Sequence, residues 1–146
     1  MTTAKQILLA AADRISQPNG WMTANYAAGL TDDINVDAAY WEMDKRGRMS
    51  PGEYCFQKAA RIIREGNFNC FCAVGAIMAE AETPKLLDEA CVLLAITIRP
   101  PHRDSAGRPT SPSPDPIVAR KLIYEWNDDG PTTITTVADA MRKAAQ

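Results

Sequence analysis

The feature that most constrains how this chain can fold is a stretch of ten residues, 70–79, without a single charged side chain. Small residues recur on one face of the helix that this stretch would form: Cys72, Gly75, Ala76 and Ala79. Because a helix that is apolar on every side must be buried, other elements have to surround it. We therefore predict a central helix that begins at Cys70 and is capped by Asn67 or Asn69.

The remaining apolar residues predict helices packed around this central one. They recur at intervals of three and four positions, the spacing of one helix face, in these segments: 4–15, 36–43, 53–65, 84–98, 116–126 and 133–145. The chain has 146 residues, which suits one domain with a real core. The predicted fold is mainly α, a compact single-domain bundle of about six helices around a buried central helix.

Capping residues sharpen several of these helix boundaries. Ser50, Pro51 and Glu53 match a capping box with proline at the first helical position. Thr83 and Asp115 each precede a proline in a similar arrangement. These residues predict where three of the helices begin.

Two segments are less regular. Residues 21–30 have no clear period and are predicted to form a loop, after which Asn35 could cap the short helix over residues 36–43. Residues 91–98 are apolar enough to be the end of a helix or a strand. Periodicity alone does not decide between these two alternatives.

Residues 99–116 change the character of the chain, because they contain six prolines among polar residues. They are predicted to form a mobile loop inside a single domain that spans residues 1–146. The helix that follows is predicted to end before a turn at residues 127–131. Its inward stripe is predicted to be Val118, Leu122 and Trp126.

The charge of the chain argues against several classes of protein. The formal net charge is −2 and the isoelectric point is about 5.4, whereas proteins that hold duplex nucleic acid usually carry an excess of Lys and Arg. No apolar run is long enough to span a membrane, and residues 7–12 are too short for a secretory signal. We therefore expect a cytoplasmic protein without a membrane-spanning segment. No motif predicts a cofactor.

The cysteines are the first candidate for chemistry. Cys70 and Cys72 lie at the predicted start of the central helix, where free N–H groups can favour a thiolate. A cysteine nucleophile needs a base within hydrogen-bond reach, and the one histidine, His102, lies in the proline-rich loop. Buried thiols are therefore the preferred interpretation. A zinc site that combines these cysteines with Cys55 and Cys91 is not predicted, because the usual paired spacing is missing.

Trp126, Asn127 and Asp128 form the most unusual polar element. Asn and Asp commonly bond backbone groups in turns, which is a purely structural interpretation. The functional alternative is a pocket in which Asn127 and Asp128 meet the start of the central helix. That pocket would bring an acid, an amide and the Cys72 thiol together.

A small basic cluster, Lys45, Arg46 and Arg48, follows Tyr40 and Trp41. Aromatic and cationic side chains together can hold single-stranded nucleic acid. The cluster is short and the whole chain is acidic, so a solvated turn is the preferred interpretation. Weak binding of single-stranded nucleic acid is the alternative.

Two motifs resemble an uncharacterised domain family of bacteria and their phages. Its members carry a Trp-Cys-Ala-Leu-Gly-Ala helix start, and residues 71–76 are Phe-Cys-Ala-Val-Gly-Ala. They also carry Trp-Asn-Asp, here residues 126–128, before a Gly-containing turn and a Thr that begins a closing helix, here Thr132 or Thr133. Phe71 replaces the usual Trp. The resemblance implies a common helical core and a phage or mobile-element setting, and it implies no activity.

These observations favour a non-enzymatic binding or regulatory protein. The chain has no convincing catalytic constellation, no cofactor motif and no strong charge bias. In the setting that the resemblance implies, we expect the partner to be a host protein, including a component of a defence complex. The alternative is a cysteine-dependent enzyme or a small-ligand-binding protein whose pocket joins Cys72 to Asn127 and Asp128.

Overall fold

A computed structural model of the chain describes residues 2–23, 25–28, 35–37, 52–66, 68–129 and 133–146. The described helices are α1 (Ala4–Ile15), α3 (Gly52–Glu65), α4 (Ala73–Glu80), α5 (Pro84–Ile98), α6 (Pro116–Asp129) and α7 (Ile134–Ala144). Three short strands accompany them: β1 (Asn25–Ala28), β2 (Asn35–Asp37) and β3 (Cys70–Phe71). The predicted mainly α, single-domain fold is confirmed.

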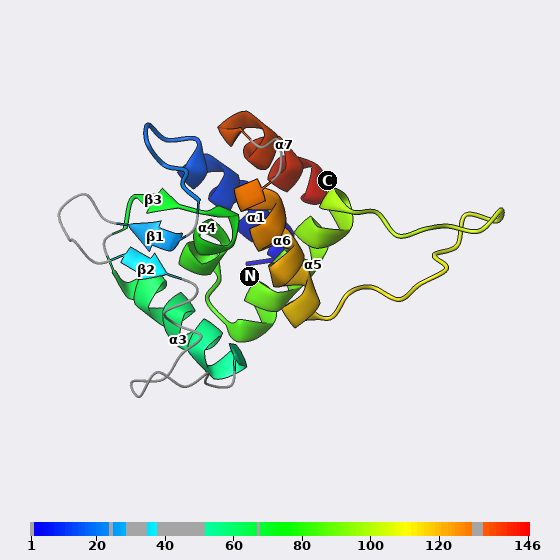
Figure 1. Cartoon of the computed structure of the whole chain (residues 1–146), viewed down its shortest axis with the longest axis horizontal. Helices are drawn as coiled ribbons and strands as arrows, with labels where there is room; N and C mark the ends of the chain where they lie inside the picture. The colour runs from blue at the N-terminus through cyan, green and yellow to red at the C-terminus, as the bar shows by residue number, and fades with distance from the viewer. Residues whose placement is uncertain (1, 24, 29–34, 38–51, 67, 130–132) are drawn as a thin grey trace.

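The central helix is α4, which contacts α1, α3, α5 and α6 (Figure 1). Every residue from Ala73 to Met78 is buried. Around α4, α1 packs against α7, and α5 packs against both α6 and α7. This arrangement confirms the prediction of a buried helix with others around it, and it places the first residues of α4 deep in the molecule.

The start of α4 differs from its prediction. Cys70 and Phe71 form strand β3, and the helix begins at Ala73 with Cys72 as its N-cap, in place of the predicted Asn69. The other predicted cap, Asn67, lies outside the described residues. The cause is tertiary, because β1 pairs with β3 in an antiparallel register that places Ala27 opposite Phe71. Pairing with β1 thus keeps Cys70 and Phe71 in a strand, although their apolar character predicted that they belong to the helix.

The small sheet has the order β2-β1-β3 and contradicts two predictions. Residues 25–28, predicted as part of a loop, form β1, and residues 35–37 form β2 where the short helix was predicted to begin. The rest of that predicted helix lies outside the described residues. Strands of two to four residues are too short to show an alternating pattern, which is why the sequence did not reveal them.

Helices α3, α5 and α7 follow their predictions closely. Thr83 caps α5, which continues to Ile98 and settles the alternative between helix and strand at residues 91–98. Thr133 caps α7. The predicted stripe of α3 is buried: Phe56, Ala59, Ala60 and Ile63. Ser50 and Pro51, predicted to start that helix, lie outside the described residues.

The inward face of α6 is not the predicted one. Val118 is 51% exposed, whereas Ala119, Ile123 and Asn127 are buried. The buried stripe is therefore shifted by one position from the predicted one. Hydrophobicity did not indicate it, because Ala119 is small and Asn127 is polar. The helix also continues to Asp129, so Asn127 and Asp128 belong to its last turn and not to a separate turn.

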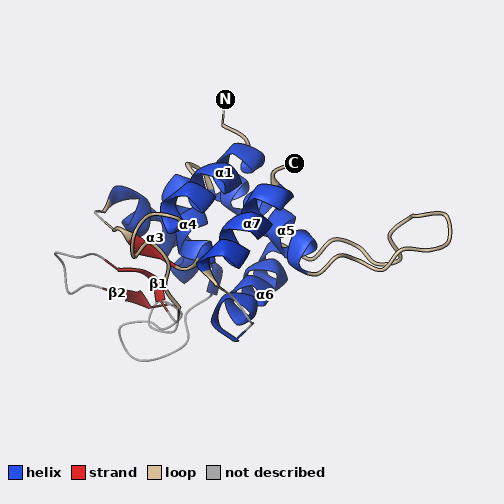
Figure 2. Cartoon of the chain, turned by 90° about the horizontal axis from the view of Figure 1, so that it is seen from above, coloured by secondary structure: helices blue, strands red, loops and turns tan. Residues whose placement is uncertain are grey.

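Residues 99–115, here called the arm, extend away from the helices at the end of the molecule opposite the sheet (Figures 1 and 2). The arm folds back on itself. Thr110 donates its N–H to the His102 carbonyl at 2.8 Å, and Arg103 pairs with Pro109 in an isolated antiparallel β-bridge. Gly107 has a φ of +80° at the tip, a conformation that L side chains rarely adopt. The predicted loop thus has a hairpin-like shape, and its mobility stays a prediction.

Candidate functional site

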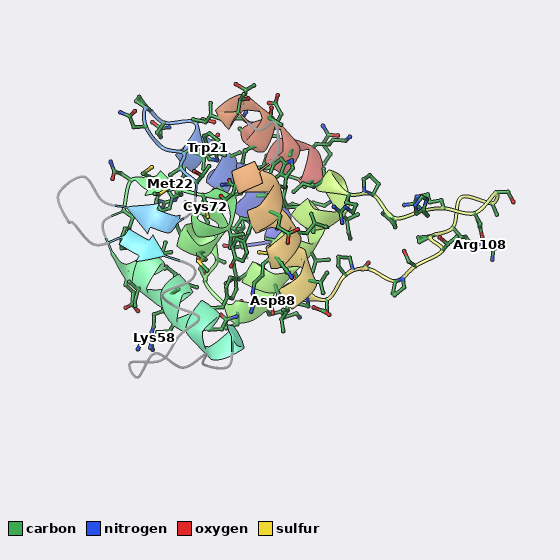
Figure 3. The ribbon with its side chains drawn as sticks, viewed as in Figure 1. Trp21, Met22, Lys58, Cys72, Asp88 and Arg108 are labelled. Carbon is green, nitrogen blue, oxygen red and sulfur yellow. The ribbon has the colours of Figure 1, made fainter. Side chains whose placement is uncertain are left out.

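The side chain that organises the candidate site is Asn127, in the last turn of α6 and only 2% exposed. Its Oδ1 accepts hydrogen bonds from the Ala73 N–H at 3.0 Å and from the Trp21 indole N–H at 2.9 Å. Its Nδ2 donates to the Met22 carbonyl at 3.1 Å and to Asp128 Oδ1 at 3.0 Å. The amide thus joins the end of α6 to the start of α4 and to the segment after α1, where Figure 3 labels Trp21, Met22 and Cys72.

The first turn of α4 explains why an amide is needed there. The first N–H groups of a helix have no partner inside that helix, and a buried group without a partner costs free energy. Cys72 Sγ accepts from the Gly75 N–H at 3.3 Å, and Asn127 accepts from the Ala73 N–H. Two side chains from distant parts of the sequence therefore satisfy this buried helix start together.

The chemistry of Cys72 follows from its surroundings. Burial raises the pKa of the Cys72 thiol to about 12, against the opposing effect of the Gly75 and Val74 N–H groups. The negative charge of Asp128 makes a smaller contribution to this rise. At neutral pH the thiol is therefore protonated, and its side chain is only 4% exposed. The advantage that a helix start can give a thiolate is outweighed here by desolvation.

The structure brings some of the predicted site residues together and separates others. Asn127 contacts the start of α4 and Asp128, as the functional alternative required, and Cys72 lies in the same cluster. Trp126 is half-buried against the core. His102 belongs to the arm, where it lines a groove with Pro100 and Val118, whereas Cys72 is buried at the start of α4. The one histidine is thus not placed to act as a base for this thiol.

Lys45, Arg46 and Arg48 are outside the described residues. Within the described part of the chain, no group of three or more His, Cys, Asp or Glu side chains is arranged to hold a metal ion. Cys70, Cys72 and Cys91 are free thiols.

A surface at the base of the arm was missed by the sequence prediction. Ile117 and Val118, at the start of α6, are 57% and 51% exposed. Val118 also lines a groove of about 330 Å³, here called the arm-base groove, whose other lining residues include Ala95, Ile96, Pro100, Pro114 and Leu122. The available signal is Val118 itself, whose apolar character and spacing predict burial although its side chain is exposed.

The sequence profile of a family described only as a family of unknown function, DUF6197, matches residues 1–146 of this chain. No curated protein and no solved structure matches the chain. In the part of the chain that the structure describes, every helix is too short or too polar to cross a membrane.

Proposed function

The chain belongs to the DUF6197 family, and on that premise we propose that it acts by binding a protein partner, without a catalytic step of its own. The observation that carries this proposal is the pair of exposed apolar residues at the base of the arm, Ile117 and Val118. Among the described residues, Leu9 is the one other large hydrophobic residue with comparable exposure. The pair lies beside the arm-base groove, so apolar surface is concentrated at one end of the molecule.

A partner that covers the two exposed apolar side chains would gain binding free energy from their burial. Fully burying a valine or isoleucine side chain contributes roughly 1.5–3 kcal/mol. Ile117 and Val118 are 57% and 51% exposed, so a partner that covers them gains about half of this from each. Grooves beside such side chains allow a partner to fit closely and exclude water. The prolines at the arm base, Pro100 and Pro114, add apolar surface with little conformational freedom to lose.

The chemistry of the Cys72 cluster supports binding over catalysis. A nucleophile has to reach its substrate as a thiolate, and Cys72 is buried and protonated at neutral pH. Asn127 uses its amide oxygen and nitrogen to hold the start of α4 and the Met22 carbonyl. Cys72 and Asn127 therefore both stabilise the start of α4, and this structural role is sufficient to explain why they are there.

The partner that we propose is a bacterial host protein, in line with the phage or mobile-element setting that the family motifs imply. Quantitative affinity capture from a bacterial lysate tests this with three baits: the wild type, the double variant Ile117→Asp/Val118→Asp and the control Leu9→Asp. Leu9 is similarly exposed but lies on α1, away from the arm-base groove. A specific partner should be retained by the wild type and by Leu9→Asp and lost by the double variant.

Two outcomes contradict the proposal. One is that the wild type retains no protein above the level of an unrelated bait. The other is that all three baits retain the same partner equally. Because the substituted side chains are exposed, each change should alter the free energy of unfolding by only about 0.5 kcal/mol. Equal melting temperatures would show that a lost partner does not reflect unfolding.

A further inference from the structure

A small groove lies between the outward face of α3 and the start of α5. It has a volume of about 250 Å³ and is here called the α3–α5 groove. It shares no lining residue with the arm-base groove, and Figure 3 shows Lys58 far from Arg108, near the tip of the arm. Its lining includes cationic side chains of α3 and the first residues around the start of α5: Lys58, Arg61, Arg64, Thr83, Pro84 and Leu87.

The α3–α5 groove is positively charged, in a chain whose formal net charge is −2. Lys58, Arg61 and Arg64 recur at every third position, which makes them successive neighbours on the surface of α3. Glu65 and Glu82 lie close in sequence, but no carboxylate lines the groove. Lys58 has a further interaction, whereas the described residues form no ion pair with Arg61 or Arg64. The charge that is available to a ligand is therefore that of the two guanidinium groups.

Arg64 reaches from α3 to the segment that precedes α5. Its guanidinium donates to the Ala81 carbonyl at 2.7 Å, two residues before the N-cap Thr83. A carbonyl occupies only part of the guanidinium donor set and leaves its charge in place, so the other N–H groups can hold an anion. The bond also orders the Arg64 side chain before a ligand binds, which lowers the entropic cost of binding.

The start of α5 adds a second source of attraction for an anion. Thr83 and Pro84 line the groove, so the positive end of the helix dipole of this 15-residue helix lies beside the two arginines. Thr83 Oγ1 accepts a hydrogen bond from the Leu86 N–H at 3.2 Å, and its hydroxyl hydrogen can donate to a ligand. Guanidinium groups from one helix and a hydroxyl and a dipole from another thus meet in one groove, a combination that suits phosphate.

We propose that the α3–α5 groove binds the phosphate group of a small phosphate ester. Arg61 and Arg64 hold the phosphate oxygens, and Thr83 donates its hydroxyl to the same group. A phosphate monoester has a charge of about −1.5 to −2 at neutral pH and several acceptor oxygens, which suits paired guanidinium groups. A volume of about 250 Å³ fits a compact ester and is below the usual size of a site for a drug-sized molecule.

A nucleic-acid backbone is a less suitable source of this phosphate. No aromatic side chain lines the groove, so a base would have no ring on which to stack. The net negative charge of the whole chain also opposes a long polyanion. The groove therefore suits a single phosphate group on a small molecule, and this site is independent of the partner surface at the base of the arm.

Titration of the full chain with glycerol phosphate, followed by NMR of the backbone amides, tests this site. In about 150 mM sodium chloride, which screens attraction between exposed charges, the Arg61, Arg64 and Thr83 amides should shift and reach saturation. Arg61→Gln/Arg64→Gln should raise the dissociation constant by about tenfold or more, because it removes two charge-assisted contacts. The matched control, Arg103→Gln/Arg108→Gln, removes the same charge from the arm and should change the dissociation constant by less than about twofold.

Arg61→Gln alone separates a lost ligand contact from a disturbed fold, because it leaves the bond between Arg64 and Ala81 in place. It should weaken binding by about threefold or more at an unchanged melting temperature. A titration that never saturates at millimolar glycerol phosphate overturns the proposal, and so does equal binding by the wild type and both groove variants.

A single-stranded oligonucleotide without terminal phosphates is the second probe. It should bind more weakly than glycerol phosphate. Tighter binding of the oligonucleotide, with a steep dependence on salt, would assign the groove to nucleic acid and overturn the proposal. None of these variants alters Ile117 or Val118, so the partner-capture experiment remains an independent test.

Discussion

Asn127 shows how a single polar side chain can hold a helical core together. It occupies a buried position on the inward face of α6, where the neighbouring positions of that face are Ala119 and Ile123. A buried amide is tolerated only when its hydrogen bonds are made. Here they go to the Ala73 N–H and the Trp21 indole on one side and to the Met22 carbonyl and Asp128 on the other.

Replacing Asn127 with alanine should therefore be costly. The Ala73 N–H and the Met22 carbonyl would lose their partner, and each unsatisfied buried group costs about 1–3 kcal/mol. We expect Asn127→Ala to lower the free energy of unfolding by about 3 kcal/mol, measured by urea denaturation. Trp21→Phe, which removes one donor and keeps the amide, should cost about 1 kcal/mol. An Asn127→Ala loss no larger than that of Trp21→Phe would contradict this role.

The buried thiols predict a loss of stability in alkaline solution. Burial raises the pKa of Cys72 and Cys91 from 9.0 to about 12. Between pH 9 and 12 the unfolded chain releases these protons while the native chain keeps them, so the free energy of unfolding falls as the pH rises. Below pH 9 both states hold the protons, and the two thiols contribute no pH dependence. Each thiol should contribute a slope of about 1.4 kcal/mol per pH unit in that window.

Urea denaturation of the wild type and of Cys91→Ala between pH 8 and 10.5 isolates this effect. Lysine and tyrosine residues also titrate in alkaline solution, but they are common to both proteins. The variant should show a shallower decline above pH 9, by about 1.4 kcal/mol per pH unit. Identical slopes in the two proteins would mean that Cys91 ionises as easily in the native state as in the unfolded chain.

The role of the site residues could be predicted only in part. The sequence suggested that Asn127 and Asp128 could meet the start of the central helix, and the structure brings them there. It could not show whether they form an open pocket or a buried cap, because that depends on how completely α1, α4 and α6 enclose them. The pKa of Cys72 was unpredictable for the same reason, because it depends on burial more than on its position at a helix start.

At the scale of elements, α6 has one face in the core and another in solvent. Its apolar residues are spread over both, since Ile123 is fully buried and Val118 is 51% exposed. Hydrophobicity alone therefore selected the wrong face. The buried polar residue Asn127 would have identified the right one, but a polar residue is normally assigned to the surface.

Alanine substitutions should separate the two faces of α6. Ile123→Ala removes three carbon atoms from a closed core and should cost about 2–5 kcal/mol of unfolding free energy. Val118→Ala should cost no more than about 0.5 kcal/mol, because its side chain is exposed. Chemical denaturation measures both. Equal losses of unfolding free energy in the two variants would mean that Val118 is as buried as Ile123, which would contradict the observed inward face of α6.

The arm depends on backbone conformation at its tip. An added Cβ at Gly107 would meet no other atom, so only the strain of a φ of +80° opposes a larger residue. Gly107→Ala should therefore speed amide hydrogen exchange in residues 102–110 and leave the melting temperature of the helices unchanged. Gly107→Asn is the matched control, because asparagine tolerates this conformation better than alanine. A fall in melting temperature for Gly107→Ala would indicate that the arm also supports the core.

At the scale of the whole molecule, the small sheet and the arm lie on opposite sides of the helices (Figure 1). Trp21 and Met22 lie close to the sheet, and the arm extends from the other side, where it lines the arm-base groove (Figures 1 and 3). The helical architecture was predictable because α4 has no charged residue between Ala73 and Ala79, and because caps such as Thr83 lie where the helices begin. The sheet and the groove were not predictable, since both arise from contacts between segments far apart in the chain.

Thiol labelling of the native protein tests most directly whether the Cys72 cluster is a structural anchor and not a reactive site. Iodoacetamide is added at pH 7.5 across a range of urea concentrations, and mass spectrometry of peptides assigns each modified cysteine. Cys70 is partly exposed and should react in the native state, whereas Cys72 and Cys91 should react only as the whole domain unfolds. Rapid and selective modification of Cys72 without urea would contradict the account and favour a cysteine-dependent enzyme.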